Sequence, residues 1–133
     1  MKNYTDEFSF VIKPSVLPQA GVGIFMCHDV SGGTKLELMP NGGEFRMLKK
    51  DDVPDALKHF VIEIGKGKCK APKVFNHLWI VWYINHSDSP NIELRLPENN
   101  YYALRDIKAG EELFTNYNAF EEPSELKEGY YST

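Results

Sequence analysis

The chain has 133 residues, 42% hydrophobic and 26% charged, which is typical of one globular domain and excludes a disordered or fibrous protein. Its net charge of −4 is uneven, because six glutamates and one lysine lie between Glu111 and Glu128, whereas basic residues outnumber acids between Arg46 and Lys73. The acidic stretch favours a basic peptide as partner and disfavours direct nucleic acid binding. The alternative is that both charged stretches are ordinary solvated surfaces.

The N-terminal segment, Met1 to Phe10, lacks the apolar core of a secretory signal. The longest apolar run, Leu78 to Ile84, is too short to span a bilayer. We therefore expect a soluble intracellular protein without membrane contact, and the sequence does not decide between nucleus and cytoplasm. Cys27 and Cys69 are both expected to be buried apolar residues rather than metal ligands or a disulfide.

The pattern of the first half of the chain predicts short strands separated by turns. Runs rich in β-branched and aromatic residues, bounded by proline or glycine, predict strands over 8–13, 24–27 and 34–39. At 51–54 two aspartates precede Val-Pro, a pattern that places an acid at the cap and proline in the first turn. This pattern predicts a helix running to about His59.

The second half continues in the same way. Strands are predicted over 60–64, 92–96, 101–105 and 112–117, and the second and third of these are joined by a hairpin loop. The apolar run 74–83 fits either a buried helix or a buried strand. Many short strands with little helix and no internal boundary predict a mainly β fold in one domain.

Three segments are polar or glycine-rich where a scaffold would not require it: Gly21-Val22-Gly23, the stretch from Tyr83 to Asn91, and the stretch from Ile107 to Tyr117. Taken singly, each has an ordinary explanation. The first is a plain turn, the second can cap a buried segment, and the third ends a strand on an aromatic residue.

Taken together and in this order, the segments make the chain resemble the SET-domain family. Members carry a Gly-x-Gly turn, an Asn-His-Ser-x-x-Pro-Asn segment and a Gly-Glu-Glu-Leu strand that ends on tyrosine. Here these are Gly21–Gly23, Asn85–Asn91 and Gly110–Tyr117, and Arg105-Asp106-Ile107 fits the usual lead-in. The resemblance extends from about Phe10 to Tyr117.

The resemblance implies a single SET domain over residues 1–133. The implied fold is a mainly β, β-clip SET fold with short helices, in which the C-terminal segment threads under a loop as a pseudoknot. That threading would bring the Asn-His segment and the terminal tyrosine together. Residues from about 118 to 133 would form a tail able to close a lysine channel.

By the same resemblance the chain would bind S-adenosylmethionine, release S-adenosylhomocysteine and need no metal. The main chain of the glycine turn would hold the methionine end of the cofactor, and the second segment would meet its amino acid and adenine groups. The implied cofactor-binding residues are Gly21, Val22, Gly23, Tyr83, Asn85 and His86.

The implied catalytic residue is Tyr117, at the junction between the methyl group and the incoming lysine. The substrate channel would include Leu94, Thr115, Phe120 and Tyr130. Methyl transfer is an in-line displacement that depends on positioning, so a hydroxyl that orients the amine suits the reaction better than a strong base.

The implied activity is therefore methylation of a lysine side chain in a protein, and histone tails are the family's usual substrates. The chain departs from the family pattern at Trp82, where an arginine is frequent, and at Asp88, where a cysteine is frequent. It also lacks the zinc-bound cysteines that close the channel in many members. The tail or a homodimer partner would have to replace them, and a non-catalytic SET-fold module that binds a peptide or protein is the alternative.

Overall fold

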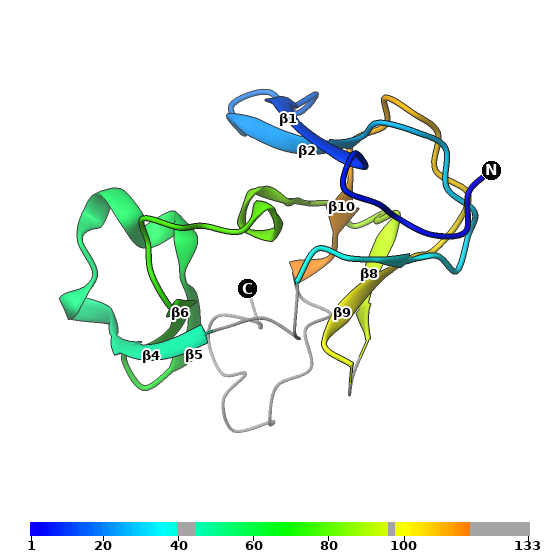
Figure 1. Ribbon diagram of the computed structural model, residues 1–133. Coiled ribbons are helices and arrows are strands. Elements are labelled where there is room, and N and C mark those ends of the chain that lie inside the picture. Colours follow the sequence, from blue (N-terminus) through cyan, green and yellow to red (C-terminus); the bar gives the residue numbers. More distant parts are fainter. Residues whose placement is uncertain (40–44, 96–97, 118–133) are drawn as a thin grey trace. The chain divides into compact units, whose positions relative to one another are not determined.

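The structure is a computed structural model that describes residues 1–39, 45–95 and 98–117 (Figure 1). The chain divides into two compact units. The first takes the described residues of 1–43 and 79–120, and the second takes those of 44–78. In chain order, the second unit is thus inserted into the first.

The first unit begins with an antiparallel hairpin of β1 (Phe10–Pro14) and β2 (Val22–Met26), in which Phe10 pairs with Met26. After the exposed Val22, every residue of β2 is buried, whereas β1 is mostly exposed. Strand β2 is therefore the one that joins the hairpin to the core.

A three-stranded antiparallel sheet has the order β3-β9-β8, with β3 at Lys35–Leu36, β8 at Ile92–Arg95 and β9 at Asn100–Ala103. Figure 1 shows β8 and β9 side by side, as their register requires. Asn99 enters β9 with φ 55°, a left-handed conformation that asparagine tolerates better than most residues.

The third element of this unit is a short parallel pair of β7 (Asn85–His86) and β10 (Phe114–Thr115). A 3-10 helix, η4 (Ile80–Tyr83), leads into β7 and contacts β2. The core beneath these elements contains the fully buried residues Ile24, Met26, Val30, Leu36, Leu38, Ile92, Ile107 and Leu113.

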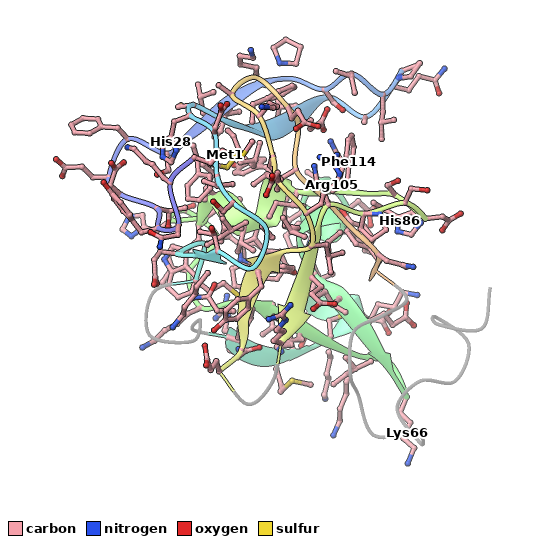
Figure 2. All side chains as sticks on the ribbon, turned by 90° about the vertical axis from the view of Figure 1, so that its right-hand side faces the viewer. Met1, His28, Lys66, His86, Arg105 and Phe114 are labelled. Atoms are coloured by element: carbon pink, nitrogen blue, oxygen red, sulfur yellow. The ribbon has the colours of Figure 1, made fainter. Side chains whose placement is uncertain are left out.

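The second unit is a three-stranded antiparallel sheet with order β4-β6-β5 and two 3-10 helices. Its elements are β4 (Phe45–Lys49), η2 (Lys50–Asp52), η3 (Asp55–Phe60), β5 (Ile62–Gly65) and β6 (Lys68–Pro72). Lys66, labelled in Figure 2, lies in the turn between β5 and β6. Cys69 and Ala71 of β6 are fully buried, and the lysines alternating with them are not.

The prediction of a mainly β fold is confirmed, but several predicted elements were wrong. The helix expected from 51 is two 3-10 turns, because Pro54 interrupts the run and cannot donate a backbone hydrogen bond. The run 74–83 becomes a helix only at Ile80–Tyr83. Strand β6 was missed because its lysines obscure the alternate burial, and strand β4 because none of its residues is buried.

The prediction of two buried cysteines was half right. Cys69 is fully buried, and desolvation raises the pKa of its thiol. Cys27 is exposed and free, because it follows the last residue of β2, where the chain turns away from the core.

Candidate functional site

The segment from Glu111 to Thr115 joins the glycine turn to the Asn-His segment. It first runs beside β2, where the amide of Leu113 donates to the carbonyl of Ile24 at 2.8 Å. It then continues as β10, in which Phe114 pairs with Asn85 and Thr115 pairs with His86. His86 and Phe114 are labelled in Figure 2, one on each of the two paired strands. One segment therefore contacts both of the other motifs.

The carboxylate of Glu112 is the point at which the three motifs meet. Glu112 is only 5% exposed. Its oxygens accept hydrogen bonds from the Ser15 hydroxyl at 2.8 and 3.0 Å, from the Val16 amide at 2.8 Å and from Nδ2 of Asn85 at 2.9 Å. A buried carboxylate needs several such donors, because its own desolvation is costly.

The two glycines of the Gly21-Val22-Gly23 turn are required for different reasons. Gly21 has φ +73°, a conformation that other residues rarely adopt, and a Cβ there would meet nothing within 4 Å. A Cβ on Gly23 would collide with Oε2 of Glu112 and lie 3.2 Å from Nδ2 of Asn85. Gly21 therefore permits the turn, whereas Gly23 permits the carboxylate to approach the backbone.

The side-chain amide of Asn85 is held by two acceptors. Its nitrogen donates to the carbonyl of Val22 at 3.0 Å as well as to Glu112. Both hydrogens of the amide are thus used within the chain. Its oxygen is the atom of this side chain left to accept a hydrogen bond from a ligand.

His86 contacts the predicted catalytic residue directly. Its Nδ1 accepts the backbone amide of Tyr117 at 3.1 Å, so the ring proton lies on Nε2, which is 3.1 Å from Oδ1 of Asp88. The rings of His86 and Tyr117 are 5.2 Å apart at a tilt of 53°. Asp88, one of the two positions that depart from the family pattern, thus takes part in orienting His86.

The hydroxyl of Tyr117 donates to the carbonyl of Ile84, the residue before Asn85. The phenol therefore lies against the start of β7, close along the chain to the predicted cofactor-binding residues. Tyr83 lies one residue further back, at the end of η4, and is half-buried.

Two of the four predicted channel residues, Leu94 and Thr115, lie in the described structure, and Phe120 and Tyr130 lie outside the described residues. Thr115 is buried beside His86, and Leu94 pairs across the sheet with Tyr101. Tyr101 is 5% exposed, and its phenol lies near Thr115 and Tyr117. Desolvation raises the pKa of this phenol, which therefore remains protonated.

Asn91 ties the Asn-His segment to the last strand. It is 3% exposed, its Nδ2 donates to the carbonyl of Glu112 at 2.8 Å, and its Oδ1 accepts the amide of Phe114 at 2.8 Å. The amide of Ser87 also donates to the carbonyl of Thr115 at 3.1 Å. Asn91 of this motif therefore fixes the fold, whereas Asn85 and His86 contact Glu112 and Tyr117.

Sequence reasoning missed Glu112, Ser15 and Tyr101. Glu112 was part of a recognised motif, but its partner Ser15 is 97 residues away along the chain and no local pattern joins them. The sequence predicts Tyr101 only as one aromatic residue of a strand. Its position opposite Leu94 required the sheet register, which the sequence does not specify.

The acidic character of the C-terminal third is partly used inside the protein. Glu111 bonds the guanidinium of Arg105 at 3.0 Å, which lowers the pKa of its carboxyl, and Glu112 is buried. The remaining four glutamates of this stretch lie outside the described residues. Two of the six acids are therefore engaged internally.

Within the described residues, no group of three or more His, Cys, Asp or Glu side chains could hold a metal ion. The same part of the chain contains no helix with the length and apolar character to cross a membrane.

The model of the SET domain matches residues 21–118, and the chain belongs to this family. The SET fold expected from the sequence is therefore confirmed. A comparison with curated proteins finds no match.

Solved structures agree in fold. A Plasmodium falciparum protein described as a candidate histone methyltransferase is 22% identical, with a TM-score of 0.56 over 86% of this chain and 97% of the other. A humanized mutant of Chaetomium thermophilum Polycomb Repressive Complex 2, bound to an inhibitor, is 24% identical, with a TM-score of 0.59. The apo complex with two Ezh2 mutations is 23% identical, with a TM-score of 0.60. This chain covers only 15% and 16% of those two longer chains.

Proposed function

We propose that the protein transfers a methyl group from S-adenosylmethionine to the ε-amine of a lysine in a protein. The observation that carries this proposal is the meeting of three segments around Glu112 and Tyr117. A scaffold does not need a buried carboxylate, an oriented amide and a tyrosine hydroxyl at one place, and membership of the SET family makes methyl transfer the reaction to test.

The residues present suit the cofactor's amino acid end. Both N–H donors of the Asn85 amide are used within the chain, and its oxygen remains as an acceptor. An ammonium group, which only donates, is a suitable partner for this oxygen. Gly21 and Val22 are exposed, so their main chain is accessible to a ligand. Main-chain groups of this turn and the Asn85 oxygen would hold the methionine end. The cofactor would supply the methyl group on a positively charged sulfur, which leaves as a neutral thioether.

Tyr117 would orient the incoming amine. A lysine amine has a pKa near ~10.4 in water and must lose a proton before its nitrogen can attack the methyl carbon. A partly dry channel beside a positive sulfur favours the neutral amine without a strong base. The Tyr117 hydroxyl, already fixed on the carbonyl of Ile84, retains lone pairs that can accept an N–H of that amine.

His86 would serve as support for this tyrosine. Its ring accepts the Tyr117 backbone amide and packs at a tilt against the phenol ring, so it limits where the hydroxyl can lie. Thr115, Tyr101 and Leu94 would form the apolar and hydroxyl-bearing wall on the neighbouring strands.

A basic protein segment is the proposed substrate class, and histone tails are the first ones to test. Two of the structurally similar proteins carry names that refer to histone methylation or to Polycomb Repressive Complex 2. The excess of glutamates over lysine between Glu111 and Glu128 would attract lysine-rich peptides rather than nucleic acid.

Titration calorimetry with S-adenosylmethionine is the first test, repeated with Asn85→Ala after its folding has been checked by thermal denaturation. Stoichiometric binding that the substitution weakens would support the cofactor site. Mass spectrometry of histone tail peptides incubated with protein and cofactor then tests transfer. A mass increase of one methyl group or more that requires Tyr117 would establish the activity.

A non-catalytic SET-fold module that binds a peptide or protein is the second candidate. It is favoured by Trp82, which stands at a position where arginine is frequent in the family. Failure of the well-folded protein to bind the cofactor, together with retained binding of a lysine peptide, would support this candidate.

A further inference from the structure

We infer that Glu112 is a positioning residue that orients the Asn85 amide toward the amino acid end of the cofactor. This inference rests on the proposed function and assigns a role to a residue that makes no contact with the reacting atoms. It follows from the charge, burial and hydrogen bonds of the Glu112 side chain.

The carboxylate of Glu112 is unusual for a structural residue. It is 5% exposed, and in the part of the chain that the structure describes none of the ion pairs includes it. A buried charge without an opposite charge costs stability, so hydrogen bonds from Ser15, Val16 and Asn85 must offset that cost. A neutral glutamine or an apolar side chain would fill the same space with a smaller desolvation cost.

The residue that the Glu112 carboxylate approaches, Gly23, has no side chain. Gly23 has an ordinary backbone conformation, yet any Cβ there would collide with Oε2 of Glu112 and lie 2.7 Å from its Cδ. The close approach places the carboxylate directly against the turn that carries Val22. Glu112 is therefore held from one side by Ser15 and Val16 and from the other by the turn.

This placement determines which atom of the Asn85 amide faces outward. The nitrogen lies between two oxygens, the Val22 carbonyl at 3.0 Å and the Glu112 carboxylate at 2.9 Å. Turning the amide over would place its oxygen against both of these acceptors, which is repulsive. The amide oxygen is thus directed away from Glu112, toward any donor that approaches from the other side.

The ligand group that this oxygen suits is an α-ammonium, which can only donate. If the amide turned over, its NH₂ group would face that ammonium and recognition of the amino acid end would be lost. Recognition of the adenosine part does not depend on this amide. Loss of the Glu112 charge should therefore weaken ligands that carry the amino acid and spare those without it.

Glu112→Gln tests this directly, because the new amide cannot accept from Val16, Ser15 and Asn85 together. Affinity is measured by calorimetry for S-adenosylhomocysteine and by ligand-observed NMR for 5′-methylthioadenosine, which lacks the amino acid. We expect the variant to lose about tenfold or more in affinity for the first ligand and less than about twofold for the second. Glu111→Gln is the matched control, since its carboxylate bonds Arg105 instead, and both affinities should stay at the wild-type values.

Equal losses for the two ligands, or none for S-adenosylhomocysteine, would overturn the role of Glu112. If wild-type protein binds neither ligand, the proposed function fails and the inference fails with it. If wild-type protein binds and Glu112→Gln binds as tightly, only the inference fails. Should Glu112→Gln not fold, Ser15→Ala replaces it, because it removes one donor to the carboxylate. A loss confined to S-adenosylhomocysteine supports the inference, and a loss shared by both ligands overturns it.

Discussion

The backbone amide of Tyr117 donates to Nδ1 of His86 at 3.1 Å, and the two aromatic rings lie 5.2 Å apart. The tyrosine hydroxyl is fixed separately, on the carbonyl of Ile84. Both ends of Tyr117 are therefore held by the Asn-His segment and the residue before it, from more than thirty positions away along the chain. The phenol is positioned before any substrate arrives, which is the condition for a group that acts by orientation.

Replacing Tyr117 with Phe should abolish most activity and leave cofactor binding nearly intact. The backbone contact to His86 remains, so the ring keeps its place and only the hydroxyl is lost. We expect methyl transfer to fall about 100-fold or more, with cofactor affinity within about threefold of wild type. Initial rates and calorimetric titrations of the same sample separate the two quantities. Equal losses in both would contradict the assigned role.

Alanine at the two glycines of the turn should have different effects. Gly21→Ala strains the backbone at φ +73°, at a cost of about 1–2 kcal/mol, but meets no neighbouring atom. Gly23→Ala pushes Glu112 and Asn85 aside, and overpacking of this kind costs about 1–3 kcal/mol. Urea denaturation should show destabilisation of both variants. Gly23→Ala should lose more cofactor affinity than Gly21→Ala, beyond what the fraction of folded protein explains, because it displaces Asn85 as well as disturbing the turn.

Tyr101→Phe tests the wall beside Thr115. The buried phenol lies near Thr115 and Tyr117, so removal of its hydroxyl should lower methyl transfer several-fold without altering cofactor affinity. Tyr102→Phe is the matched control, because Tyr102 is the next residue, is less buried and bonds Glu98. Equal rates for the two variants would show that the Tyr101 hydroxyl has no part in the channel.

Much of this arrangement could be predicted from the sequence, because it depends on local chemistry. A glycine turn, a polar segment after an apolar run and a strand ending on tyrosine are short patterns with strict requirements. Their order was sufficient to predict the family and the mainly β fold. The contact between His86 and Tyr117 was expected only in general terms, as two segments lying close together.

The remainder depended on long-range packing. Nothing around Ser15 indicates that its hydroxyl caps a carboxylate 97 residues later. Strand β6 was missed because two lysines alternate with only two small buried residues, Cys69 and Ala71, so the apolar period of two is weak. Strand β4 was missed because it buries no residue. The sequence predicts Pro54 in the first turn of a helix, whereas in the structure it separates two 3-10 helices.

Acid stability should depend on Asp6 near the N-terminus. The backbone amide of Phe8 donates to its carboxylate at 2.9 Å, and with the Lys2 ammonium it lowers the pKa of Asp6 to about 2. Since this value lies below the unfolded one of about 3.9, the stabilisation is complete above that pH and is lost as the pH falls toward 2. Melting temperatures between pH 5 and 2 should therefore drop more steeply for wild type than for Asp6→Asn. Lys2→Met, which retains the Phe8 bond, should keep most of the wild-type slope, and identical slopes for wild type and Asp6→Asn would refute this role.

Under the proposed function the rate of methyl transfer should rise with pH, because the nucleophile would be the neutral amine. The neutral fraction of a lysine with pKa near ~10.4 grows about tenfold per pH unit between pH 7 and 9. The Tyr101 phenol does not ionise in this range, because burial raises its pKa, so the channel wall keeps its charge while the substrate changes. Rates should be measured with a lysine peptide under saturating cofactor, and cofactor affinity should be measured at each pH. These two measurements separate the effect of amine deprotonation from any change in cofactor binding. A flat rate with constant cofactor affinity would mean that another step limits turnover or that lysine is not the substrate, and a peptide with arginine in place of lysine distinguishes these two outcomes.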